Sequence, residues 1–137
     1  GSTTTTIQGN DPNANNIVIV ADNIRISNFM ITGADSAISI TDSMNCRISG
    51  NNITGNKRGI HMSGSASYNT IEGNIITGNT FNGVYLESTD LYNYTAHSNI
   101  ITGNSTMMRE LVVEVLEKHK FVYENLINQS VITVLLL

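Results

Sequence analysis

Four side chains near the middle of the sequence could do chemistry together: Arg58, His61, Tyr85 and Glu87. A tyrosine ring can stack on the apolar face of a sugar, while His61 and Glu87 can hydrogen-bond its hydroxyl groups. The same His and Glu could act as a general acid and a general base in hydrolysis or lyase chemistry. A solvated surface without a chemical role is the third interpretation. We therefore treat the four residues as a candidate ligand-binding site, assign no catalytic residue, and keep His61 and Glu87 as the pair to test for catalysis.

These residues come together only if the chain repeats, and it does. The tetrad Ile-Thr-Gly-Asn occurs at 53–56, 76–79 and 101–104, and related tetrads occupy 31–34 and 7–10. The glycines of the five tetrads stand at positions 9, 33, 55, 78 and 103, so the steps are 24, 22, 23 and 25 residues. A repeat of this length is typical of a solenoid, in which each coil stacks on its neighbours.

Within each repeat, apolar and polar residues alternate, which is typical of strands. The alternation covers 37–42, 59–63 and 83–87, second strands are predicted at 25–26, 47–48 and 70–71, and third strands surround the Ile of the tetrads. Three strands and three bends then close one coil. The pattern places the following residues inside: Ile38, Ile40, Ile60, Met62, Val84 and Leu86. The residues between them face outward, and this brings His61, Tyr85 and Glu87 onto one surface with Arg58 at its edge.

The unusual composition fits this arrangement, because 19 Asn and 18 Ile make up more than a quarter of the chain. β-Branched side chains pack well in a narrow coil interior. Asn tolerates the left-handed backbone of a bend, and amides that recur in every coil can hydrogen-bond in a ladder. Two structural ladders are predicted, Asn51/Asn74/Asn99 and Asn56/Asn79/Asn104, and the bends beside the second contain Gly55, Gly78 and Gly103.

Several classes of protein are excluded by composition. With 7 Lys and Arg and a net charge of −4, the chain offers no continuous phosphate-binding stripe, so no nucleic-acid partner is expected. Its single cysteine, Cys46, aligns with an inward position, and no Cys/His cluster has metal-ligand spacing, so we expect no metal and no cofactor. The apolar run 131–137 is too short to cross a membrane, so no membrane insertion is expected. Gly1 and Ser2 resemble a cloning scar, and the residues given contain no export signal.

The C-terminal part, residues 105–137, differs from the repeats of residues 1–104. From Thr106 to Gln129 there is no Gly or Pro, and apolar residues recur at helical spacing, which predicts one amphipathic helix over 106–128 followed by a strand from Ser130 to Leu137. The helix would cap the last coil, form a homo-oligomer interface through 106–137, or be a segment grafted onto the repeats. These three roles stay open.

Coils such as 58–79 (RGIHMSGSASYNTIEGNIITGN) and 82–104 resemble the right-handed parallel β-helix repeats of the pectin-lyase-like superfamily. The likeness is greatest to its NosD-type branch of carbohydrate-binding and sugar-hydrolysing domains, and it covers Ile7 to Asn104. The resemblance implies a polysaccharide partner, an extracellular or cell-envelope location, and, in enzymes of this type, acidic and basic residues along one sheet. The sequence departs from the enzyme pattern, because Glu87 has only Asp42 and Asp90 as acidic company. Exposed aromatic residues in turns are further candidates for sugar stacking: Tyr68, Phe81, Tyr92 and Tyr94.

We therefore expect an all-β solenoid, a right-handed parallel β-helix of four to five short coils with a C-terminal amphipathic helix and a terminal strand. The expected function is a non-catalytic structural or carbohydrate-binding module of a larger extracellular or envelope protein. One alternative is a truncated polysaccharide lyase, hydrolase or epimerase. The other is an engineered or structural solenoid with a capping or dimerisation helix.

Overall fold

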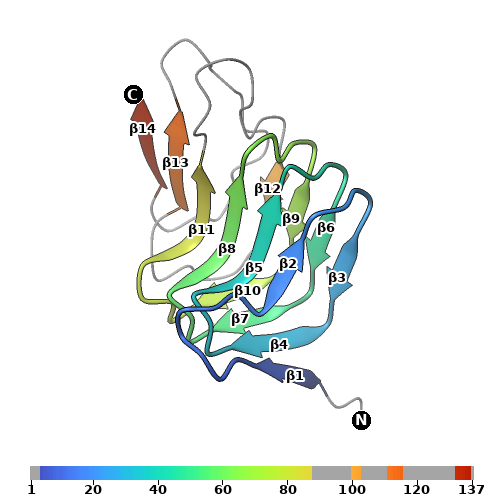
Figure 1. The fold of residues 1–137 in the computed structure, drawn as a ribbon, viewed down its shortest axis with the longest axis vertical. Helices are drawn as coiled ribbons and strands as arrows, with labels where there is room; N and C mark the ends of the chain where they lie inside the picture. Colours follow the sequence, from blue (N-terminus) through green and yellow to red (C-terminus); the bar gives the residue numbers. More distant parts are fainter. Residues whose placement is uncertain (1–3, 88–99, 103–110, 116–131, 137) are drawn as a thin grey trace.

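The computed structural model describes residues 4–87, 100–102, 111–115 and 132–136, and it describes side chains within the first of these ranges. The described residues form fourteen β-strands and no helix. As Figure 1 shows, the chain winds in successive coils whose strands stack side by side. Every described strand pairing is parallel. The protein is a right-handed parallel β-helix, as the repeats predicted.

The coils build three sheets, which we call A, B and C. Sheet A contains β1 (Thr5–Gln8), β4 (Phe29–Thr32), β7 (Asn52–Thr54) and β10 (Ile75–Thr77). Sheet B contains β2 (Ile17–Ile19), β5 (Ser36–Thr41), β8 (Arg58–Ser63), β11 (Asn82–Glu87), β13 (Leu111–Val115) and β14 (Ile132–Leu136). Sheet C contains β3 (Arg25–Ser27), β6 (Arg47–Ser49), β9 (Thr70–Glu72) and β12 (Ile100–Thr102).

The core is a set of columns of identical or similar side chains, one from each coil. Ile31 and Ile53 are register partners in sheet A, as are Ile48 and Ile71 in sheet C, and all four are fully buried. Burying an isoleucine contributes about 1.5–3 kcal/mol, so each added coil is stabilised mainly by such contacts. The inward residues predicted for sheet B are confirmed, since all of them are fully buried: Ile38, Ile40, Ile60, Met62, Val84 and Leu86. Cys46 is also buried, at the inward position expected for it.

The two predicted asparagine ladders are confirmed in the described coils. The Asn74 Oδ1 accepts hydrogen bonds from the Asn51 backbone N–H (2.9 Å) and from the Asn51 amide (3.1 Å). In the second ladder, the Asn79 Oδ1 accepts from the N–H and the amide of Asn56 at 3.0 and 3.1 Å. These amides thus satisfy buried backbone groups at bends, where no strand partner is available. Asn99, Asn104 and Gly103 lie outside the described residues. The register predicted for them is wrong, because the strand between them, β12, pairs with β9 in sheet C, with Ile100 opposite Thr70, and not with β10 in sheet A. The tetrad shows the period of the repeat, but strand pairing decides which sheet it joins.

A third buried amide was not predicted. The Asn69 Oδ1 accepts from the Cys46 N–H at 2.8 Å, and its amide donates to the Ser43 carbonyl at 3.0 Å. It links two coils at the bend before β9, as the ladder residues do elsewhere. The residue aligned with Asn69 in the preceding coil is Cys46, so no Asn precedes it at this place.

Glycine is required at bends and where coils approach closely. Gly55 and Gly78 have φ of +71° and +65°, in the left-handed region that a side chain makes costly. Gly59, at the start of β8, is required for a different reason. A Cβ atom placed there would lie 2.3 Å from the Gly83 carbonyl oxygen in the next coil. The spacing of the coils at this place therefore depends on the absence of a side chain.

The predicted helix over 106–128 is wrong for residues 111–115, which form strand β13. β13 pairs with β11 on one side and with β14 on the other. The physical reason is twofold: Val112, Val113 and Val115 are β-branched, and β11 would otherwise present an unpaired edge. The rest of the predicted helix lies outside the described residues. β14 lies within the predicted strand 130–137, and the boundary of the two predicted units at residue 104 stays a prediction.

Candidate functional site

The candidate residues lie on the outer face of sheet B, where parallel in-register strands align outward positions in columns. One column runs through Ser39, His61 and Tyr85 and continues to position 112. The next runs through Thr41 and Ser63 and continues, two residues after Tyr85, at Glu87. β8 and β11 are neighbours in Figure 1, so His61, Tyr85 and Glu87 occupy adjacent places on this face.

His61 is held by two neighbours from β11. Its Nε2 lies 2.8 Å from the Glu87 Oε2, and the side chains of His61 and Glu87 are 20% and 29% exposed. Its ring stacks on the Tyr85 ring, with centroids 5.0 Å apart and an interplanar angle of 28°. His61, Tyr85 and Glu87 therefore lie together on sheet B, as the alternating pattern of the sequence predicted.

Arg58 lies at the edge of the same cluster. Its guanidinium carbon is 5.5 Å from the centroid of the Tyr85 ring and 5.8 Å from that of Phe81, which are distances of cation–π contacts. Its Nη1 donates to the Asp35 Oδ2 at 3.1 Å, so the charge is paired with a carboxylate from the preceding coil. Its buried Nε has no hydrogen-bond partner among the described residues.

The aromatic surface differs from the expected one. We expected Tyr85 to stack on a sugar, but one face of its ring lies against His61, because directly opposed residues in parallel strands are only about 4.8 Å apart. The exposed aromatic ring of the cluster is Phe81, which is 52% exposed and precedes β11. The sequence predicts Phe81 only as an exposed turn residue, and it does not indicate that Asp35 belongs to the cluster. The places of Phe81 and Asp35 around Arg58 depend on how the bends before β11, β8 and β5 stack on one another.

The acidic residues near the cluster have separate roles. Asp42, expected as company for Glu87, accepts hydrogen bonds from the Ser65 N–H and hydroxyl at 2.9 and 3.3 Å, and so fixes a bend. Asp90 lies outside the described residues. Glu114, in β13, is the register partner of Glu87. The sequence did not indicate this neighbour, because residue 114 was predicted to be helical. Most glycosidases use two carboxylates that flank the scissile bond. Catalysis by the His61–Glu87 pair stays the alternative to the non-catalytic role and is tested below.

A family model described as "Periplasmic copper-binding protein (NosD)" matches residues 1–133. The chain belongs to the NosD family. The resemblance that the repeats predicted is thereby confirmed, and the match extends beyond Asn104 into the C-terminal part. No curated protein matches the chain, and no solved structure matches it. Across the described residues, no helix is long and apolar enough to span a membrane.

The family description names copper, so we tested whether the described residues of this NosD chain fit the metal. Protein copper sites are built from imidazole nitrogens together with thiolate, thioether or oxygen ligands. Among the described residues there is no group of three or more His, Cys, Asp or Glu side chains that could hold a metal ion. His61 is bonded to Glu87 on the outside of sheet B, whereas the Cys46 thiol is buried and donates to the Ala21 and Met44 carbonyls. The described part of the chain therefore does not fit a copper site. His97 and His119 lie outside it.

Proposed function

We propose that this NosD-family chain is a non-catalytic structural module of the periplasm that binds a saccharide on the outer face of sheet B. Its family is described as periplasmic, and the fold and family together indicate a structural module there. The observation that carries the binding proposal is the exposed Phe81 ring beside Arg58, at the end of a row formed by Tyr85, His61 and Glu87.

The proposed contacts follow from the chemistry of these side chains. The Phe81 ring offers an apolar surface for a sugar ring, and Glu87 and His61 offer polar atoms for its hydroxyl groups. The Arg58 Nε–H is buried and unpartnered in the described residues, and a shift of the guanidinium toward the ligand would give it a hydrogen bond to a ligand oxygen. A guanidinium binds a carboxylate better than a hydroxyl, so acidic saccharides are the favoured class.

Titration calorimetry with oligogalacturonate and with cello-oligosaccharides tests this proposal. We expect the acidic oligosaccharide to bind, and Phe81→Ala to weaken binding about tenfold, since an aromatic contact contributes about 0.5–1.5 kcal/mol. The matched control is Tyr68→Asn, which removes another exposed aromatic ring at a bend with φ of +57° where Asn is tolerated.

Two results would overturn it. If no saccharide binds, or if Phe81→Ala binds as well as the unaltered protein, the sheet B face is not the site and only the structural role is left. If the protein releases reducing or unsaturated ends from the oligosaccharides, and His61→Ala or Glu87→Ala stops the release, the module is an enzyme.

A further inference from the structure

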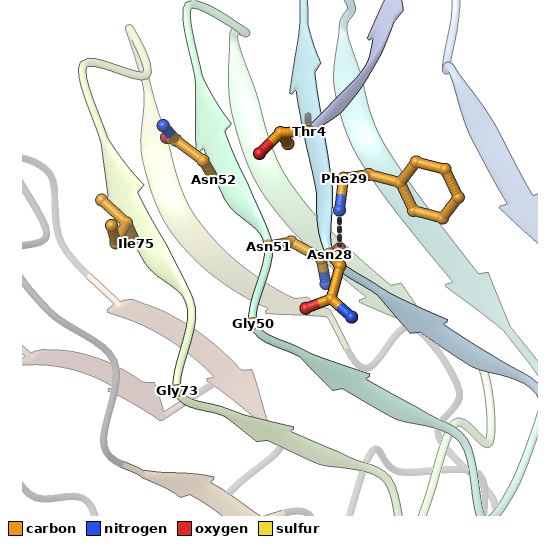
Figure 2. Close-up of a pocket in the computed structure, with 8 residues that line it drawn as sticks. All are labelled: Thr4, Asn28, Phe29, Gly50, Asn51, Asn52, Gly73 and Ile75. Atoms are coloured by element: carbon orange, nitrogen blue, oxygen red, sulfur yellow. Dashed lines mark hydrogen bonds between the residues drawn. The ribbon is translucent and has the colours of Figure 1, made fainter. Parts of the chain in front are cut away.

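A hollow lies on another side of the β-helix from the sheet B site, at the bend between sheets C and A. Figure 2 shows the eight residues that line it, and their cavity has a volume of about 560 Å³. Ligand pockets in proteins usually measure about 300–1,000 Å³, so the hollow is large enough for a small ligand. None of the lining residues belongs to the cluster on sheet B: Thr4, Asn28, Phe29, Gly50, Asn51, Asn52, Gly73 and Ile75.

The hollow exists because small residues stack at one bend of successive coils. Asn28, Gly50 and Gly73 each stand just before the sheet A strand of their coil, with φ of 63°, 66° and 62°. A Cβ atom placed on Gly73 would meet nothing within 4 Å. The backbone at Gly73 is therefore open to a ligand, whereas the Asn28 side chain lies over the Gly50 bend.

The lining combines an apolar surface with an unsatisfied acceptor. Ile75 is 46% exposed and offers an apolar surface at this place, in a sheet A column that also contains Asn52 and Met30. Its register partner Asn52 stands beside it in the adjacent strand (Figure 2). The Asn52 Oδ1 is buried and has no hydrogen-bond partner among the described residues, an arrangement that costs about 1–3 kcal/mol until a donor is supplied. No lining residue is charged.

We propose that this hollow is a second binding site, for an uncharged ligand that has hydroxyl donors and an apolar face, as a neutral saccharide does. On binding, the Asn52 side chain rotates into the hollow, so that its buried Oδ1 accepts a hydrogen bond from a ligand hydroxyl. The apolar face of the ligand packs on Ile75, and the open space at Gly73 leaves room for the ligand. An anionic ligand is disfavoured, because the lining has no cation to compensate its loss of hydration. The inference does not rest on the sheet B site, since the two sites share no residue.

The hollow can be filled without disturbing the fold by Gly73→Asn. The new side chain enters open space, and Asn28 already occupies the equivalent bend at nearly the same φ. Gly50 is unsuitable for this purpose, because a Cβ atom there would lie 3.0 Å from the Asn28 Oδ1. Tyr68→Asn is the matched control, because it places the same residue at a bend outside the hollow.

The experiment is an NMR titration of the ¹⁵N-labelled protein with cellobiose and with galacturonate dimer as probes. We expect cellobiose to shift the NMR signals of the Gly50 and Gly73 backbone amides and of the Asn52 side-chain amide. Gly73→Asn is expected to weaken this binding at least tenfold. Tyr68→Asn and Phe81→Ala are expected to leave it unchanged. The inference is overturned if cellobiose shifts none of these signals, if Gly73→Asn binds as well as the unaltered protein, or if the galacturonate dimer binds the hollow more tightly than cellobiose. Shifts confined to β8 and β11 would support the sheet B site and reject this one.

Discussion

At the residue scale, the buried asparagines connect each coil to the one before it. The Asn79 side chain makes three buried hydrogen bonds: its Oδ1 accepts from the N–H and amide of Asn56, and its amide donates to the Ile53 carbonyl at 3.1 Å. All of these partners belong to the preceding coil. An alanine cannot replace any of these bonds, and the bend is too deeply buried for water to reach the partners freely.

We predict that Asn79→Ala lowers the free energy of unfolding by about 3 kcal/mol, because it leaves buried donors and an acceptor without partners. Urea denaturation followed by circular dichroism measures this. Asn10→Ala, at an exposed position, is the control and is expected to change stability by less than about 0.5 kcal/mol. Equal stabilities of the two variants would show that the ladder does not stabilise the coils.

At the scale of elements, β13 shows how tertiary pairing overrides a local pattern. Short apolar runs fit helix and strand almost equally well, and the spacing of Val112 and Val115 suited a helix face. In the structure, β13 hydrogen-bonds to β11 and β14, and its register is set by pairs such as Leu86 with Val113. The edge of β11 needs a partner, and β-branched residues supply one with little entropic cost.

Val113→Ala distinguishes the two interpretations by the sign of its effect. In the strand, Val113 is the register partner of the buried Leu86, so we predict that the variant lowers the free energy of unfolding by about 2 kcal/mol. In a helix, Val113 would lie off the apolar stripe, and alanine would stabilise by about 0.5 kcal/mol.

Val112→Ala is its matched control, because the strand predicts a small effect on stability for this variant and the helix predicts a large one. Its register partner Tyr85 is on the outer face of sheet B, whereas in the helix Val112 would be part of the buried stripe. Thermal denaturation of the two variants is the measurement. A stabilising Val113→Ala beside a strongly destabilising Val112→Ala would contradict the strand.

At the scale of the whole molecule, stability is a sum over neighbouring coils. Every described pairing joins strands of adjacent coils, so each coil is stabilised by the coils on its two sides. In sheet B the described order ends with β2 on one side and β14 on the other. Val18 lies in the edge strand β2 at the register position of the outward residue Ser39, and it is 56% exposed; Val20, just after β2, is 74% exposed.

We predict that deleting residues 105–137 lowers the melting temperature by about 10 °C and promotes aggregation, because β11 loses β13 and its edge becomes exposed. Differential scanning calorimetry and light scattering are the measurements, with deletion of Gly1 and Ser2 as the control. A soluble truncated monomer with an unchanged melting temperature would mean that the C-terminal strands do not stabilise the coils.

The sequence by itself determined the architecture of the coils. Its period, its alternating apolar residues and its repeated Asn and Gly predicted the parallel β-helix, the inward columns and the two ladders, because each of these depends on a residue and its equivalents one coil away. The same periodicity placed His61, Tyr85 and Glu87 on one face. Successive coils are related by a translation along the helix axis, so the sequence pattern of one coil shows which residues stack on their equivalents in the next.

Only the tertiary structure decided what the side chains of that face contact. Three contacts join residues from different coils: Tyr85 stacks on His61, Phe81 lies beside Arg58, and Arg58 pairs with Asp35. The residue types at these positions differ from one coil to the next. The strand at 111–115 and the hollow beside Asn52 and Ile75 likewise depend on neighbours distant in sequence. Such contacts are set by the packing of one coil on the next, and the pattern within a single coil does not contain that information.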